Sequence, residues 1–117
     1  MTDPSDEIDP VSWLRAATAE AAHRRAALQR DLDGMVAAAQ DATDDEHDPE
    51  GTTAFERAQV QSLLDANAER LAELGAALER VRAGVHGSCE GCGEAIDPTR
   101  LLARPMARTC VRCARRR

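Results

Sequence analysis

Residues 89–113 of this chain read CEGCGEAIDPTRLLARPMARTCVRC, and they hold all 4 of its cysteines. The cysteines form two Cys-x-x-Cys pairs, Cys89 with Cys92 and Cys110 with Cys113, separated by seventeen residues. Two such pairs about 15–20 residues apart are a strong signal for a tetrahedral structural zinc site. The spacing predicts a small C-terminal four-cysteine zinc-finger module over residues 85–113, with Zn²⁺ as the cofactor and these cysteines as its ligands.

Other uses of the cysteines are disfavoured. Disulfides belong to oxidising compartments, and no apolar segment with a small-residue cleavage site follows Met1, so we expect a cytoplasmic location. A redox Cys-x-x-Cys would lie in a strand–helix unit and would not need a second copy. Four thiolates leave no position open for catalysis, and they make His86 a packing or surface residue rather than a ligand.

The rest of the chain has the composition of long helices. Trp13 and Phe55 are the only aromatic residues, while Ala, Leu, Glu and Arg dominate the middle of the sequence. No apolar run approaches the ~18 residues of a membrane span, so no membrane partner is expected. Residues 1–51 hold 13 acidic residues against 4 arginines, whereas residues 98–117 hold 7 arginines and no acid. The acidic half argues against nucleic-acid binding by the molecule as a whole.

Helix signals divide the sequence into segments. The polar, acidic residues 1–8 are expected to be disordered. Asp9 and Pro10 are typical of an N-cap and a first helical position, and the helix is expected to run to about Gln40. Charge, Pro and Gly interrupt the pattern at 41–51. A second helix is expected from about Thr53, with a Thr-x-x-Glu capping box, to about Ala83. The domains are therefore a hairpin over 9–84 with its tip at 41–51, the finger over 85–113 and a basic tail over 114–117.

Both expected helices carry a seam of mostly apolar residues at alternating steps of four and three. The first seam is Leu14, Thr18, Ala21, Arg25, Leu28, Leu32, Met35 and Ala39, and the second is Val60, Leu64, Asn67, Leu71, Leu74, Leu78, Val81 and Val85. Folding the chain at residue 46 brings each position i opposite position 92 − i, and the seams then mirror each other. The pattern predicts a mainly all-α protein built on an antiparallel two-helix coiled-coil hairpin, and a monomer because the hairpin covers its own seam.

This register sets Arg25 opposite Asn67. One hypothesis is that the two form a polar layer that fixes the register of the helices, as single polar seam residues do in coiled coils. The alternative is that Arg25 extends to solvent while Asn67 bonds to water.

The turn of the hairpin is strongly acidic. Asp41, Asp44, Asp45, Glu46, Asp48 and Glu50 lie within ten residues. Carboxylates bind Mg²⁺ and attract basic side chains, although charge runs are usually no more than solvated turns. The sequence has no evident nucleophile–base pair and no phosphate-cradling glycine loop, so we expect a docking protein and not an enzyme.

The finger resembles the zinc-finger signature of the DksA/TraR family of bacterial transcription regulators. The resemblance rests on residues 86–96, on residues 100–107, which read RLLARPMA, and on the second cysteine pair, and with the acidic-tipped hairpin it covers about residues 9–113. It implies direct binding to RNA polymerase and no sequence-specific DNA binding. It also implies entry of the coiled coil into the secondary channel, often together with the alarmone ppGpp.

The family's tip carries two aspartates with an Asp-x-x-Asp spacing. Asp45 and Asp48 keep that spacing, so the resemblance assigns the tip role to them. Glu50 stands where the family has alanine, and His86 stands where it usually has tyrosine. Because four residues follow Cys113, we expect the C-terminal helix of longer members, which contributes to alarmone sites, to be absent. The alarmone is accordingly the least supported of the implied partners.

Two further functions stay open at the level of sequence. The basic C-terminus is compatible with a DNA-binding zinc-finger protein that contacts phosphates. A structural adaptor with an inert tip is the other alternative.

Overall fold

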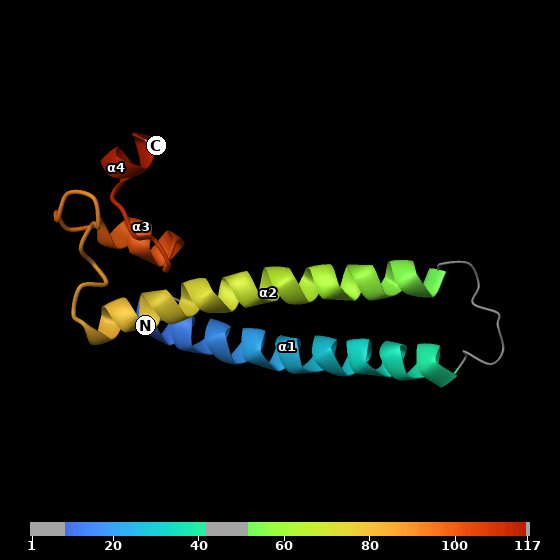
Figure 1. Ribbon diagram of the computed structural model, residues 1–117. Helices are drawn as coiled ribbons and strands as arrows, with labels where there is room; N and C mark the ends of the chain where they lie inside the picture. The colour runs from blue at the N-terminus through green and yellow to red at the C-terminus, as the bar shows by residue number, and fades with distance from the viewer. Residues whose placement is uncertain (1–8, 42–51, 117) are drawn as a thin grey trace. The chain divides into compact units, whose positions relative to one another are not determined.

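The computed structural model describes residues 9–41 and 52–116, and it is mostly helical. The helices are α1 (Pro10–Asp41), α2 (Thr52–Arg82), α3 (Pro98–Ala103) and α4 (Val111–Arg115). These two described ranges contain no strand, only an isolated antiparallel bridge between Ser88 and Ala95. The predicted mainly all-α fold is confirmed, and α1 and α2 lie side by side as an antiparallel hairpin (Figure 1).

The start of α1 follows the cap predicted from the sequence. An oxygen of the Asp9 carboxylate accepts a 2.7 Å hydrogen bond from the backbone N–H of Ser12, and Pro10 is the first helical residue. The carboxylate thereby satisfies an N–H that the first helical turn leaves without a partner, and proline loses nothing at a position where its missing N–H is not needed. The capping box expected at Thr53 involves a side chain outside the described ones.

The chain divides into two compact units. The first, here called the base unit, contains α1 as far as Ala19 and the chain from Ala72 onward; the second, the arm unit, is Glu20–Leu71. Each unit contains a stretch of α1 and a stretch of α2. Buried side chains on the two helices are Leu14, Ala17, Leu74 and Ala77 in the base unit, and Ala21, Leu64 and Asn67 in the arm unit.

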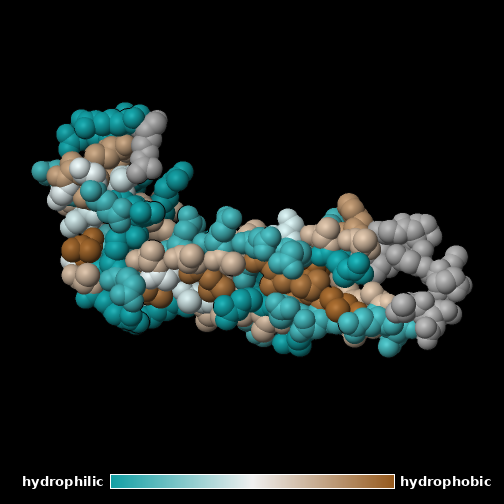
Figure 2. All heavy atoms as spheres, in the orientation of Figure 1, coloured by the Kyte–Doolittle hydropathy of each residue, from teal (hydrophilic) through white to brown (hydrophobic). Residues whose placement is uncertain are grey.

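Burial follows the predicted seams closely. Every predicted seam position is buried or half-buried except Arg25 and Val85, which are exposed. Val85 lies beyond the last residue of α2, so the helical period no longer directs its side chain inward. Figure 2 shows apolar residues gathered along the line where the two helices meet.

Small residues add to the contact in the base unit. Ala17 and Ala77 are 9% and 0% exposed, although neither belongs to the seams predicted from the sequence. Alanine at a helix contact lets two backbones approach closely, because its side chain is a single methyl group, and the core here is correspondingly thin.

The contacts of Asn67 in the arm unit agree with one part of each hypothesis. Asn67 is 6% exposed, and its side-chain amide donates a 2.9 Å hydrogen bond to the backbone carbonyl of Ala21. Arg25 is exposed. The contact that aligns the two helices is therefore a bond from the Asn67 side chain to the backbone of α1. It reaches Ala21, one helical turn before Arg25, the residue that the 92 − i rule places opposite Asn67.

Candidate metal centre

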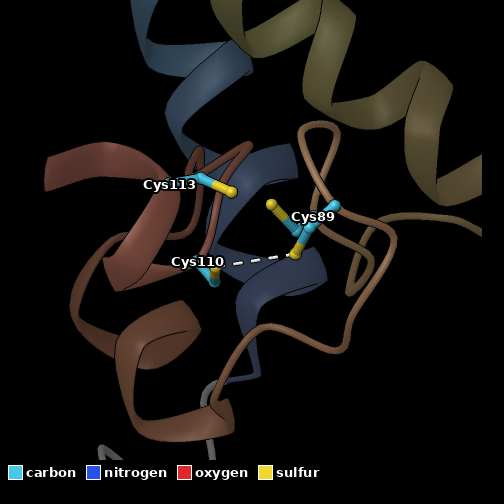
Figure 3. Close-up of side chains that lie close together, drawn as sticks. Cys89, Cys110 and Cys113 are labelled. Atoms are coloured by element: carbon cyan, nitrogen blue, oxygen red, sulfur yellow. Dashed lines mark hydrogen bonds between the residues drawn. The ribbon is translucent and has the colours of Figure 1, made fainter. Parts of the chain in front are cut away.

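The four cysteines of the finger meet at one point. Their Sγ atoms all lie within 4.8 Å of one another. Cys89 and Cys92 come from the loop after α2, Cys110 is the N-cap residue of α4, and Cys113 lies within α4. Figure 3 shows the sulfur atoms of Cys89, Cys110 and Cys113 turned toward one another.

The spacing of the sulfur atoms suits a tetrahedral ion. A Zn–S bond of about 2.3 Å in a tetrahedron separates neighbouring sulfurs by about 3.8 Å, and the Sγ atoms of Cys92 and Cys110 are 3.9 Å apart. Thiolates are the ligands that soft and borderline ions such as zinc prefer. Cys89 and Cys110 are buried, Cys113 is half-buried and Cys92 is exposed. The donor set and its geometry therefore fit a structural zinc ion with a closed shell.

A tight backbone turn shapes the first cysteine knuckle. The N–H of Gly93 donates to the carbonyl of Cys89 at 2.9 Å, and Gly93 has a φ of 81°, a conformation that favours glycine. Gly91 is needed for a different reason: a Cβ built on it would lie 2.9 Å from the Sγ of Cys113. The glycines thus let the knuckle close around the sulfur cluster.

Backbone groups and neighbouring thiols shift the pKa values of the cysteines in opposite directions. The N–H of Cys110, and after it those of Cys92 and Gly91, lower the pKa of the Cys89 thiol to about 6, against burial, which raises it. The backbone of Cys113 likewise lowers the pKa of Cys110. Interaction with Cys89 is the largest of the effects that raise the pKa of Cys113 to about 12. The surroundings of the cluster thus favour the thiolate form at Cys89 and disfavour it at Cys113.

A small apolar core backs the sulfur cluster. Ile96 is 2% exposed and packs with Cys89 and Cys110, and the half-buried Leu101 packs against this group. The N–H of Ile96 donates to the carbonyl of Gly87 at 2.7 Å. The side chain of Asp97 accepts from the N–H of Thr99 at 2.9 Å and caps α3. The finger thus has one apolar residue with full burial, and the cysteines supply most of the remaining core.

His86 is engaged by the backbone. Its Nε2 lies 2.8 Å from the carbonyl oxygen of Pro105, and the group of metal-ligating side chains found in the described chain consists of the four cysteines. This contact joins the segment before the first cysteine pair to the segment before the second, in keeping with the packing role expected for His86.

An ionic contact that the sequence analysis missed lies beside the first knuckle. Glu90 approaches Arg80 of α2 at 3.7 Å and Arg108 at 3.1 Å. Neither arginine stands at a periodic position relative to Glu90, so no spacing rule could have paired them.

A second feature missed by the sequence is a cavity of about 330 Å³ in the base unit. It is lined by Trp13, Arg100, Ala103, Arg104, Pro105, Met106 and Ala107. The lining places an indole and two guanidinium side chains around one space.

Asp45 and Asp48, the tip residues expected from the sequence, lie outside the described residues. The described chain approaches them as far as Asp41, the exposed last residue of α1.

Comparison with known proteins agrees with this geometry. Residues 84–117 match the family described as "Prokaryotic dksA/traR C4-type zinc finger". The structure of transcription factor DksA2 from Pseudomonas aeruginosa is similar over 98% of this chain and 89% of its own, with a TM-score of 0.57 and 25% sequence identity. These matches support a DksA/TraR family protein. The hairpin and the four-cysteine cluster are the DksA-like features of its fold.

A curated relative is similar to part of this chain. A protein of Aquifex aeolicus (strain VF5), described only as uncharacterized, is 40% identical over 55 residues. The match spans 47% of this chain and 38% of that protein's length. In the part of the chain that the structure describes, no helix is both long and apolar enough to span a bilayer.

Proposed function

We propose that this protein is a non-enzymatic transcription regulator that binds bacterial RNA polymerase and enters its secondary channel with the hairpin. The observation that carries the proposal is the similarity to the transcription factor DksA2 over 98% of the chain, together with the family match of the finger. The helices of the hairpin have 32 and 31 residues, and a helix of that size is about 48 Å long. An element of this length suits a protein that acts at a distance from where it docks.

In this proposal Cys89, Cys92, Cys110 and Cys113 hold a zinc ion. When bound, zinc supplies a structural cross-link between the two ends of the finger and contributes directly to its folding free energy. The thiolates bind the ion, and Ile96 excludes water from one side of the cluster, being 2% exposed. The finger then forms a stable base for docking.

Asp45 and Asp48 are the proposed acting residues at the tip. Their carboxylates are hard-oxygen ligands that suit Mg²⁺ and basic side chains, and the proposal brings them near the catalytic centre of polymerase. Support for this role comes from the Asp-x-x-Asp spacing in the sequence.

The remaining partners follow from the same proposal. We place the protein in the cytoplasm, as a monomer, because its polymerase is there and the hairpin covers its own seam. For ppGpp, the support is the cavity lined by Trp13, Arg100 and Arg104, since guanidinium groups bind phosphates and an indole stacks on bases.

The direct test is binding of the purified protein to purified bacterial RNA polymerase, followed by the lifetime of an open promoter complex. Polymerase binding with a changed lifetime is expected. Association should weaken as salt increases, because charged surfaces steer it. If no complex with polymerase forms at low salt, the proposal is wrong.

DNA binding is the second candidate, favoured by the exposed Arg112, Arg115 and Arg116 in and after α4. Affinity for duplex DNA that falls steeply with salt and is lost in the Arg112→Gln/Arg115→Gln variant would support it over polymerase binding. The third candidate, a structural adaptor, predicts polymerase binding without any change in complex lifetime.

A further inference from the structure

Glu90 lies inside the first cysteine knuckle, between Cys89 and Cys92, and its carboxylate faces two arginines. One oxygen lies 3.1 Å from the Nε of Arg108, and the other lies 3.7 Å from a terminal nitrogen of Arg80. The backbone N–H of Glu90 also donates to the carbonyl of Arg108 at 2.8 Å. The knuckle is thereby tied both to the approach to the second cysteine pair and to α2.

Arg80 is the unusual member of this group, because arginine is rarely buried without close partners. It stands in the last turn of α2, and its side chain is 12% exposed. Its other terminal nitrogen donates to the carbonyl of Met106 at 3.4 Å, while its buried Nε has no hydrogen-bond partner among the described residues. Burial lowers the pKa of Arg80, and Glu90 acts in the opposite direction. Glu90 is thus the carboxylate partner that offsets the cost of burying this guanidinium.

The charges of the metal centre strengthen this contact. Four thiolates around Zn²⁺ carry a formal charge of −2, and Glu90 adds another negative charge between two of the ligands. The guanidinium groups of Arg80 and Arg108 are the cations placed to offset it. When the metal leaves, the four cysteines are no longer held together, and the closed knuckle no longer fixes the position of Glu90.

We propose that Arg80 is a positioning residue for the metal centre: through Glu90 it fastens the first cysteine knuckle to the last turn of α2, so that loss of the metal loosens that turn. The link acts within the base unit and needs no polymerase. It rests on the zinc part of the proposed function and is independent of the part that concerns transcription.

A double-mutant cycle on the full chain tests the link. The variants are Arg80→Met, which keeps most of the buried volume, Glu90→Gln, which leaves α2 unchanged, and the two together. The first measurement is the rate at which Zn²⁺ passes to the chelator 4-(2-pyridylazo)resorcinol. Residues that support metal ligands typically affect affinity by about tenfold or more. We expect each single variant to release zinc about tenfold faster and the double variant to be no faster than the faster single variant.

Arg82→Met is the matched control. Arg82 lies on the same turn of α2 and pairs with Glu79, but both side chains are largely exposed, at 76% and 69%. Its removal should leave the zinc-release rate unchanged. The proposal would be overturned if the double variant released zinc at a rate that multiplies the effects of Arg80→Met and Glu90→Gln. It would also be overturned if Arg82→Met increased the zinc-release rate as much as Arg80→Met does.

The second measurement is hydrogen exchange at the amides of residues 78–82, with and without zinc. The wild-type protein should lose protection there when the metal is removed, and Glu90→Gln should show the same low protection in both states. Protection that depends on zinc equally in wild type and Glu90→Gln would overturn the link even if Arg80→Met fails to fold. Metal analysis of the wild type distinguishes failure of the zinc assignment from failure of the link alone. A chain that takes up no Zn²⁺ contradicts both, whereas a chain that binds Zn²⁺ and gives the outcomes above contradicts only the link.

Discussion

The side-chain amide of Asn67 in α2 donates a 2.9 Å hydrogen bond to the backbone carbonyl of Ala21 in α1. Both residues are buried, at 6% and 4% exposure. Sliding one helix past the other by a turn would remove the amide from this carbonyl and leave it buried without a partner, which is costly. Asn67 therefore acts as a register determinant of the arm unit.

Replacement of Asn67 by leucine is expected to raise stability and loosen register. Leucine adds apolar contact to the seam, which we estimate at about 1–2 kcal/mol of unfolding free energy, while the contact to Ala21 that sets the alignment is lost. Thermal unfolding followed by circular dichroism measures the first effect, and NOEs between the helices measure the second. Asn67→Ala is the control and should cost about 1 kcal/mol. A leucine variant less stable than wild type would mean that the hydrogen bond outweighs the apolar contact.

Gly91→Ala should lower the affinity of the finger for zinc and leave the stability of the metal-free hairpin unchanged. The new Cβ would lie 2.9 Å from the Sγ of Cys113. A free cysteine side chain can rotate away from such a contact, but one held by a metal cannot. Competition with a zinc chelator measures the affinity. The matched control is Gly87→Ala, whose Cβ meets only Leu101 at 3.8 Å, an ordinary contact. Equal zinc affinities for the two variants would contradict the close packing at Gly91.

Removal of zinc should unfold residues 85–113 and leave most of the helicity. The finger has one aliphatic residue buried to 2%, Ile96, which is too small a core to fold without a cross-link. The hairpin helices, by contrast, have their own seam. Chelation followed by circular dichroism and amide NMR spectra should show loss of dispersion confined to the finger and to the turn of α2 that contacts it. An unchanged spectrum of residues 85–113 after complete chelation would exclude a structural role of the metal.

Zinc affinity should fall as the pH decreases, because the bound state requires all four thiolates. In the folded finger, the backbone N–H of Cys110 is the main cause that lowers the pKa of the Cys89 thiol, to about 6. A thiol with a lowered pKa stabilises the folded chain at high pH, and this contribution is lost as the pH falls through about 6. Isothermal titration in buffers of different ionisation enthalpy counts the released protons. An affinity independent of pH between 5 and 8 would contradict thiolate ligation.

The double variant Asp45→Ala/Asp48→Ala should bind polymerase nearly as well as wild type and lose the effect on promoter-complex lifetime. In the proposed function these carboxylates act at the tip, whereas docking depends on other surfaces. Asp41→Ala is the control, since Asp41 is an exposed acid at the end of α1, and it should keep the effect. A double variant with full regulatory effect would favour the adaptor alternative.

The hairpin and the sulfur cluster could be predicted from the sequence because both leave local, regular patterns. Steps of three and four residues placed Leu14, Leu64 and Leu74 in the core, where the structure has them. The spacing within each cysteine pair is likewise a local signal, and the four Sγ atoms meet as expected.

Contacts between segments without a shared period could not be predicted. Arg80 reaches the carbonyl of Met106, twenty-six residues away, and Glu90 meets Arg108 across the finger. Both contacts depend on how the loops close around the cysteines, which no periodicity encodes. The pairing of Arg25 with Asn67 failed for a related reason: the 92 − i rule aligns seam positions, while the actual partner of Asn67 is a backbone carbonyl one turn away.

The core of the finger has a consequence for how its sequence diverges. Cys89 and Cys110 are both metal-ligand candidates and buried core residues, packed with Ile96. A substitution at either position removes a donor atom and packing volume in one step, so a lineage that abandons the metal must acquire larger apolar residues at several positions together. Single mutational steps along that path pass through poorly folded proteins, and selection is therefore expected to hold all four cysteines as a set.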